Sequence, residues 1–167
     1  FFMLGQKVSG NEAVVKRMKE LGNELGNHSF DHPQLTKLSV PEIQAQINNT
    51  NQLIANASGG SGATVVRPPY GAVNDTVKAT IPYPLIMWNV DTLDWKTRNA
   101  TSINHEILST TTNGSIILMH DIHDATADAL PSVLKNLKEQ GYSFVTVSQL
   151  LEWSGDTGIG PHFGSYK

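Results

Sequence analysis

The sequence predicts an α/β protein in which parallel strands alternate with helices. Short apolar runs alternate with amphipathic stretches, and the helices between the runs are long enough to connect parallel strands. Polar clusters follow four of the predicted strands, at the positions where α/β folds carry their chemistry. An α/β sheet and a (β/α) barrel both fit this pattern.

The first half of the chain alternates strands with two long helices. The predicted elements are strand Phe1–Leu4, helix Asn11–Leu21, a helix from Ser39 to about Ile54, and strand Thr64–Val66. Gly22 ends the first helix. Ser39 and Glu42 have the spacing of a capping box at the start of the second. Its apolar stripe consists of Ile43, Ile47 and Ile54.

The second half continues the alternation. The predicted elements are strand Leu85–Val90, helix Ser102–Thr110, strand Ser115–Met119, helix Asp128–Gln140, strand Tyr142–Val147 and helix Ser148–Trp153. Residues after Trp153 show no periodicity, and no linker long enough to divide domains is present. We therefore expect one domain over residues 1–153 and a C-terminal tail over residues 154–167.

The composition argues against several classes of function. Lys and Arg total 12 against 15 Asp and Glu, without a basic block, so we expect no nucleic-acid partner. No apolar run approaches the roughly 20 residues of a membrane span, and we expect none in this segment. The chain has no cysteine, which excludes Cys nucleophiles, Cys metal ligands and disulfides. A neutral polymer such as a glycan is compatible with this balance.

Two histidines lie four residues apart in the first polar cluster. In an extended segment His28 and His32 would be roughly 13 Å apart, too far to share a metal ion. Pro33 disfavours helical geometry at His32, so we expect a tight turn after a strand. Imidazole favours Zn²⁺ or a similar metal, and a catalytic site needs a third protein ligand. The alternative is a pair of histidines without metal.

Three further clusters follow later strands. Two prolines after Arg67 predict a rigid turn that can aim the Tyr70 N–H at an oxyanion, and Arg67 could hold a carboxylate. Asp94 precedes Trp95, an aromatic wall suited to a sugar face. His120 ends a strand, and histidine is a residue type that serves as a general acid or base. Each cluster also has a purely structural alternative. The Arg67 turn would be a rigid connection, Asp94 and Trp95 a helix N-cap with a core tryptophan, and His120 a histidine packed at a strand end.

Together these clusters resemble the polysaccharide deacetylases that share the NodB homology domain, also called carbohydrate esterase family 4. The family motifs H-[ST]-x-x-H-P, R-x-P-[YF]-G, D-x-x-D-W and L-x-H match, in order, His28–Pro33, Arg67–Gly71, Asp91–Trp95 and Leu118–His120. The resemblance implies a deformed (β/α) barrel, partial over residues 1–153, that lacks its first strand or strands in this chain. The implied reaction is hydrolysis of N-acetyl groups on β-1,4-linked N-acetylglucosamine.

One family motif is absent. The motif T-F-D-D-G supplies the catalytic base and the third metal ligand, and it would precede Phe1. Asp31, Asp121 and Asp124 do not match it. The chain begins within a predicted strand and without an initiator Met, so we expect a fragment that is inactive alone. Its expected partner is the missing N-terminal segment of the same protein, and any signal or anchor would lie upstream.

The resemblance also implies the roles of the metal-side residues. His28 and His32 would hold Zn²⁺, or Co²⁺ or another divalent transition metal, together with the absent aspartate. Arg67 would hold the absent base. The Tyr70 N–H would stabilise the oxyanion.

The remaining implied roles concern proton transfer and substrate. His120, paired with Asp94, would protonate the departing amine, while Trp95 and Leu118 would line the acetyl pocket. Among the family's polymers, the compact loops and the missing cysteines favour peptidoglycan and a bacterial enzyme that is extracellular or at the cell surface. The N-x-[ST] sequons weakly favour the fungal chitin deacetylases instead. The alternatives are a chitin, chitooligosaccharide or acetylxylan deacetylase, and a non-catalytic glycan-binding relative.

Overall fold

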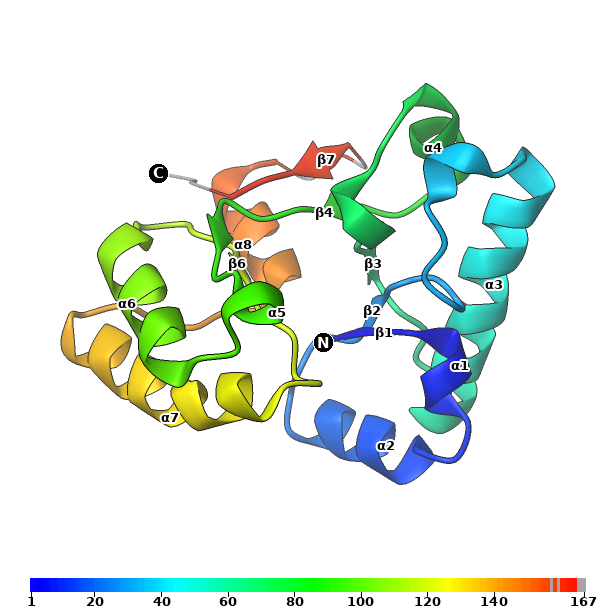
Figure 1. Cartoon of the computed structure of the whole chain (residues 1–167). Helices are drawn as coiled ribbons and strands as arrows, with labels where there is room; N and C mark the ends of the chain where they lie inside the picture. Colours follow the sequence, from blue (N-terminus) through cyan, green and yellow to red (C-terminus); the bar gives the residue numbers. More distant parts are fainter. Residues whose placement is uncertain (157, 159, 165–167) are drawn as a thin grey trace. The chain divides into compact units, whose positions relative to one another are not determined.

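The computed structural model describes residues 1–156, 158 and 160–164, and the chain divides into two compact units (Figure 1). The first unit comprises residues 1–87 and 146–162, and the second comprises residues 88–145 with the residues after 162. Each unit combines parallel strands with helices. The α/β class predicted from the sequence is therefore confirmed.

The first unit is built on a sheet of five short strands in the order β1-β2-β3-β4-β7, all paired in parallel. Its strands are β1 (Phe2–Met3), β2 (Gly26–Asn27), β3 (Val65–Val66), β4 (Leu85–Ile86) and β7 (Pro161–His162). Its helices are α1 (Gly5–Val8), α2 (Glu12–Glu20), α3 (Val40–Ala57), α4 (Asp75–Thr80) and α8 (Val147–Ser154), with 3-10 helices η1 (Leu35–Lys37) and η2 (Pro69–Gly71).

Helix α3 links two apolar clusters of this unit and contacts both α1 and α2 (Figure 1). Ile43 and Ile47 pack with residues of β3, α4 and β4, while Ile54 packs with residues of α1 and α2. The predicted stripe is thus the buried face of the helix. The capping box is also confirmed, because the Ser39 N–H donates to Glu42 Oε2 over 2.8 Å.

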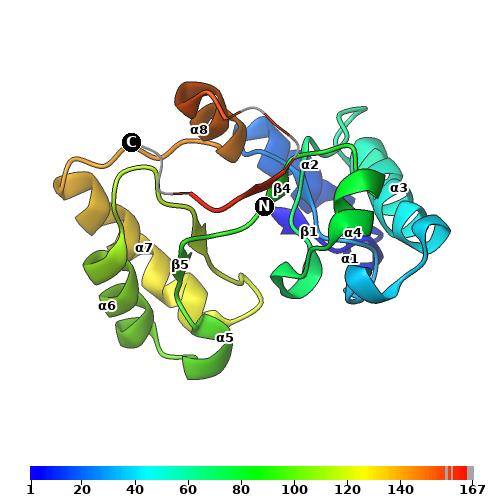
Figure 2. The same cartoon turned by 90° about the horizontal axis from the view of Figure 1, so that it is seen from above.

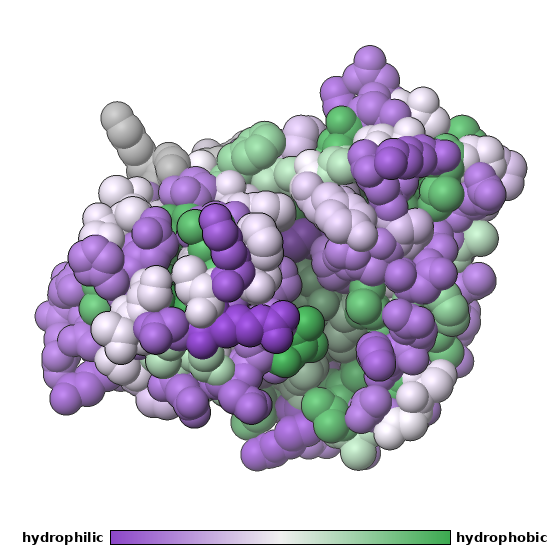
Figure 3. Space-filling view, viewed as in Figure 1, coloured by the Kyte–Doolittle hydropathy of each residue, from purple (hydrophilic) through white to green (hydrophobic). Residues whose placement is uncertain are grey.

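The second unit has a parallel strand pair and three helices. The strands are β5 (Val90–Asp91) and β6 (Ile117–Leu118), and the helices are α5 (Asp94–Thr97), α6 (Ala100–Thr110) and α7 (Asp124–Glu139). Helices α6 and α7 lie side by side (Figure 2) and bury the cluster Ile103, Ile107, Ala129, Val133 and Leu137. Hydrophilic side chains cover most of the outward surface of α6 and α7 on the face in Figure 3.

The strand predicted at Leu85–Val90 is wrong, because the chain changes partners within it. The Met87 N–H still donates to the His162 carbonyl in the first unit. The Asn89 N–H donates instead to the Ile116 carbonyl, and the Asn89 side-chain oxygen accepts from the Ile116 N–H over 2.8 Å. A single apolar run therefore gives two strands, one in each unit.

The strand predicted at Tyr142–Val147 is also wrong, because both ends of the segment serve helix termini. The Tyr142 N–H donates to the Leu137 carbonyl at the end of α7. Thr146 forms a capping box with Gln149 at the start of α8. Helix α7 begins four residues earlier than predicted, with Asp124 in its first turn, where a negative charge is favourable.

The expected tail contains one strand. β7 pairs with β4, so this part of the chain extends the first sheet; residues 157, 159 and 165–167 lie outside the described residues. The boundary at residue 153 and the closure of a barrel stay predictions. None of the helices within the described residues combines the length and the apolar character that crossing a bilayer requires.

Candidate active site

The turn after β2 brings His28 and His32 together. Their ring centroids lie 4.8 Å apart with an edge-on arrangement of 71°. The turn contains two residues with left-handed backbone, Ser29 (φ 69°) and His32 (φ 68°). Such geometry costs a non-glycine residue about 1–2 kcal/mol. The tight turn predicted after a strand is therefore confirmed, and the surrounding side chains must stabilise it.

Three polar side chains stabilise this turn. Asn27, buried in β2, accepts from the Ser29 N–H over 2.9 Å, and the Ser29 hydroxyl accepts from the His32 N–H over 3.1 Å. Gln46 of α3 accepts from the Phe30 N–H over 2.7 Å and donates to Asp31 Oδ1 over 2.7 Å. Helix α3 thus holds the turn from its outer side. Sequence reasoning missed Gln46, for which no local pattern gave a signal.

The tautomer of His28 is set by a backbone carbonyl. His28 Nδ1 lies 2.6 Å from the Arg67 carbonyl oxygen, which can only accept, so Nδ1 carries the proton. The lone pair then resides on Nε2. A hydrogen bond from the second ring nitrogen is the usual support of a metal-ligating histidine.

The Arg67 side chain is a buried cation. Its Nε and Nη2 donate to the Ile86 and Met87 carbonyls, each over 3.2 Å, and its guanidinium lies 4.2 Å from the centroid of the Phe2 ring. Burial lowers the pKa of Arg67 to about 10, so the group stays charged near neutral pH. Gly26 leaves space for the aromatic ring, because a Cβ there would lie 2.5 Å from it.

The turn after β3 presents Tyr70. Tyr70 has left-handed backbone (φ 61°), and its side chain is 68% exposed. The following two N–H groups, of Gly71 and Ala72, donate to the carbonyls of Pro68 and Pro69. The Tyr70 ring lies 4.6 Å from that of His32. The structure thus groups Tyr70, Arg67 and the two histidines in the first unit.

In the second unit a buried carboxylate holds His120. Asp94 Oδ1 lies 2.8 Å from His120 Nδ1, and Asp94 Oδ2 accepts from the His120 N–H over 2.6 Å and from the Thr126 hydroxyl over 2.8 Å. Burial raises the pKa of Asp94, but the hydrogen bonds from the His120 side chain and backbone and from Thr126, with the charge of His120, outweigh it and leave the pKa lowered.

The two other predicted residues of this unit differ in exposure. The Trp95 side chain is half exposed at the start of α5, whereas Leu118 is buried in β6, where its carbonyl accepts from the Thr92 hydroxyl. Their expected role in an acetyl pocket stays a prediction. The buried Thr126 was missed by sequence reasoning, although it begins the buried stripe of α7 that continues through Ala129 and Val133.

Comparison with known proteins decides the family. The polysaccharide deacetylase profile matches residues 1–82. A solved structure of the peptidoglycan deacetylase PdaC from Bacillus subtilis is 45% identical, with a TM-score of 0.87, over 91% of this chain and 75% of that one. The chain belongs to the polysaccharide deacetylase family.

Two further polysaccharide deacetylases are similar. A structure described as T48 deacetylase with substrate has 38% identity and a TM-score of 0.93 over 97% of this chain and 81% of that one. PgdA of Listeria monocytogenes, a peptidoglycan-N-acetylglucosamine deacetylase, is 49% identical over 90% of this chain. The chain spans 32% of the length of PgdA, and the same share of PdaC, which is named a peptidoglycan-N-acetylmuramic acid deacetylase.

The two histidines are not joined by a third possible ligand in the described structure. Within residues 1–156, 158 and 160–164, no group of three His, Cys, Asp or Glu side chains could hold a metal ion. Asp31, which follows the first histidine, is instead hydrogen-bonded by Gln46. The origin of the third metal ligand stays a prediction.

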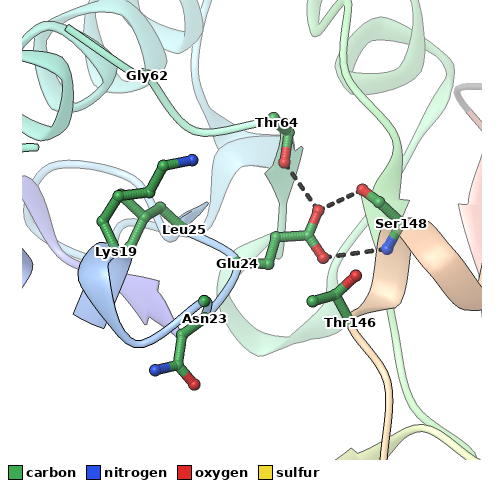
Figure 4. Close-up of a pocket in the computed structure, with 9 residues that line it drawn as sticks. Lys19, Asn23, Glu24, Leu25, Gly62, Thr64, Thr146 and Ser148 are labelled. Atoms are coloured by element: carbon green, nitrogen blue, oxygen red, sulfur yellow. Dashed lines mark hydrogen bonds between the residues drawn. The ribbon is translucent and has the colours of Figure 1, made fainter.

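A polar pocket of about 250 Å³ lies at the amino ends of strands β2 and β3 of the first sheet (Figure 4). Glu24 and Thr64 precede β2 and β3, whereas His28 and Arg67 follow the same parallel strands. Glu24 accepts from the Thr64 hydroxyl over 2.8 Å and from the backbone N–H and hydroxyl of Ser148. These contacts attach the first turn of α8 to the sheet. The pocket is therefore separate from the histidine turn.

Proposed function

We propose that this chain forms part of a metal-dependent hydrolase that removes N-acetyl groups from N-acetylglucosamine residues of a cell-wall polysaccharide, peptidoglycan. The observation that carries the proposal is the turn that holds the rings of His28 and His32 4.8 Å apart. The printed activities of PgdA and PdaC support peptidoglycan as the polymer. An extracellular or cell-surface location belongs to the same proposal.

Peptidoglycan is the polymer that we propose, and chitin, chitooligosaccharides and acetylxylan are the alternatives. PgdA is named for deacetylation of N-acetylglucosamine and PdaC for that of N-acetylmuramic acid, so both sugars of the polymer belong in the assays. This chain spans about a third of each of these relatives. The proposal therefore concerns the full-length protein.

The donor chemistry of the histidine turn fits a divalent transition metal. His28 Nε2 carries a lone pair because its Nδ1 donates to the Arg67 carbonyl, and the His32 ring lies beside it. Imidazoles bind Zn²⁺ and Co²⁺ well. A metal held by His28 and His32 would supply Lewis-acid polarisation of the acetyl carbonyl. We propose that the third ligand and the catalytic base are aspartates outside these 167 residues.

Arg67 and Tyr70 serve the first half of the reaction in this scheme. The buried guanidinium of Arg67 holds the base carboxylate by charge and keeps it ionised. That carboxylate takes a proton from water as the water oxygen bonds to the acetyl carbon. The Tyr70 N–H donates to the carbonyl oxygen as negative charge develops on it, which is the task of an oxyanion donor.

His120 serves the second half. Its Nδ1 proton faces the Asp94 carboxylate, which can only accept, so Nε2 is the atom that exchanges a proton with substrate. As the carbon–nitrogen bond breaks, the leaving nitrogen takes the proton from His120 Nε2, and acetate and a free amine result. Trp95 and Leu118 would line the acetyl pocket.

Acetate release tests the proposal. The full-length protein, supplied with Zn²⁺, is incubated with N-acetylglucosamine oligomers, peptidoglycan and acetylxylan, and acetate is measured. The expected result is release from peptidoglycan that His28→Ala abolishes and that the exposed control His105→Ala leaves unchanged. Release from acetylxylan alone would indicate an esterase. Glycan binding without any acetate would indicate a non-catalytic relative.

A further inference from the structure

A threonine of α7 contacts the carboxylate that holds His120. The Thr126 hydroxyl lies 2.8 Å from Asp94 Oδ2, and Thr126 is only 4% exposed. Because an ionised carboxylate can only accept, the hydroxyl is the donor. The bond joins residues 32 positions apart in the sequence, from two different helices.

The Thr126 hydroxyl supplies the fourth hydrogen bond of the Asp94 carboxylate. Two carboxylate oxygens offer about four acceptor sites. Asp94 Oδ1 accepts from the Trp95 N–H over 2.8 Å and faces His120 Nδ1, while Oδ2 accepts from the His120 N–H and from Thr126. The two donors at Oδ2 together fix the rotation of the carboxylate. Oδ1 is thereby directed at the His120 ring.

Helix α7 makes Thr126 a fixed support. The threonine begins the buried stripe that continues through Ala129 and Val133, and this stripe packs against Ile103 and Ile107 of α6. The Thr126 N–H already donates to the His123 carbonyl over 2.9 Å. The helix backbone at Thr126 is thus fixed, and its hydroxyl donates to Asp94 from that fixed position.

We propose that Thr126 is a positioning residue for the deacetylation reaction. Its hydroxyl holds the Asp94 carboxylate in the rotation that keeps Oδ1 on His120 Nδ1, and so aims His120 Nε2 at the leaving nitrogen. This role rests on the proposed function, because it takes His120 as the general acid. Thr126 itself touches neither the substrate nor the metal ligands in this scheme.

Substitutions in the full-length protein test the role. Thr126→Val keeps the shape and removes the hydroxyl, and we expect kcat to fall about tenfold, equivalent to about 1.4 kcal/mol, with KM within about twofold. Thr126→Ser keeps the hydroxyl and should restore most of kcat. The control Thr110→Val removes an exposed hydroxyl that donates to a backbone carbonyl in α6, and it should leave kcat unchanged.

A spectroscopic measurement separates positioning from loss of stability. In the proton NMR spectrum, the resonance of the His120 Nδ1 proton should move upfield in Thr126→Val and return in Thr126→Ser. If Thr126→Val does not fold, Thr126→Ala carries the same predictions without adding a methyl group. An unchanged kcat and resonance in Thr126→Val, or a Thr126→Ser variant as impaired as Thr126→Val, would overturn the proposal. A wild-type protein that releases no acetate would refute the proposed function, and the resonance would still decide whether Thr126 positions the ring.

Discussion

The histidine turn of the first unit and the buried carboxylate of the second differ in what their hydrogen bonds offset: backbone strain in the turn and a buried charge at Asp94. The turn combines left-handed backbone at Ser29 and His32 with hydrogen bonds from neighbouring side chains, and it brings two imidazole rings together. The Asp94 carboxylate, in contrast, is a buried charge that accepts hydrogen bonds from Trp95, His120 and Thr126. In the proposed function, the metal site takes its remaining groups from other parts of the full-length protein, whereas Asp94 and His120 pair within this chain.

The largest expected effect is the loss of turnover when His120, the proposed general acid, is removed. His120→Ala in the full-length protein should lower kcat by about 10²–10⁴-fold, because general-acid assistance is lost. Bound metal should stay near the wild-type amount, since His120 is not a ligand in the proposed scheme. Acetate release and metal content measured on the same preparation check both expectations. His105→Ala, an exposed histidine of α6, is the matched control. Loss of metal in His120→Ala would contradict the proposal that His120 takes no part in metal binding.

Asp94→Asn should destabilise the folded protein by about 2–3 kcal/mol near neutral pH, because an amide cannot accept all four hydrogen bonds and lacks the charge. The pKa of Asp94 is lowered on folding, so the carboxylate's contribution is present above its unfolded pKa of about 3.9 and is lost as the pH falls through the lower folded pKa. Denaturant unfolding of both proteins from pH 7 to pH 3 measures the difference.

The difference should be constant above about pH 5 and should shrink below about pH 4. Asp91→Asn is the matched control, because Asp91 lies three residues earlier, at the end of β5, and its carboxylate accepts from the Leu93 N–H. We expect that change to cost less than about 1 kcal/mol. A difference between wild type and Asp94→Asn that grows as the pH falls would contradict the hydrogen-bonded carboxylate.

The smallest effect concerns the support of the histidine turn. Gln46→Ala should cost about 1–2 kcal/mol, because the Phe30 N–H and the Asp31 carboxylate lose their partner. Metal affinity should fall about tenfold, as for other groups that orient ligands. Calorimetric unfolding and a Zn²⁺ titration measure the two quantities. Gln44→Ala, on the exposed side of the same helix, should change neither. Equal effects of both substitutions would show that Gln46 does not support the turn.

The sequence predicted the local parts of the fold and site. Periodicity placed α3 and its buried isoleucines, and the spacing of His28, His32 and Pro33 predicted the turn. These features depend on residues close together in the chain, so patterns can show them. The resemblance to the deacetylases also named Asp94 and His120, which the structure brings to 2.8 Å across 26 positions.

What the sequence did not predict depends on distant partners. Asn89 interrupts the apolar run after Leu85, and its backbone and side-chain hydrogen bonds to Ile116 show that the run divides between two strands. The contacts of Gln46 with the histidine turn and of Thr126 with Asp94 join separate elements. For Thr126 a signal existed, because a polar residue begins the buried stripe of α7.

Zinc affinity tests most directly the central claim, that His28 binds the metal and His120 does not. Calorimetric titration of the full-length wild type, His28→Ala and His120→Ala with Zn²⁺ compares the two histidines under one set of conditions. If His28 is a ligand and His120 is not, His28→Ala should weaken binding by more than about 100-fold, beyond the effect of an orienting group, while His120→Ala stays within about threefold of wild type. Wild-type affinity in His28→Ala, or equal loss in both variants, would contradict the account.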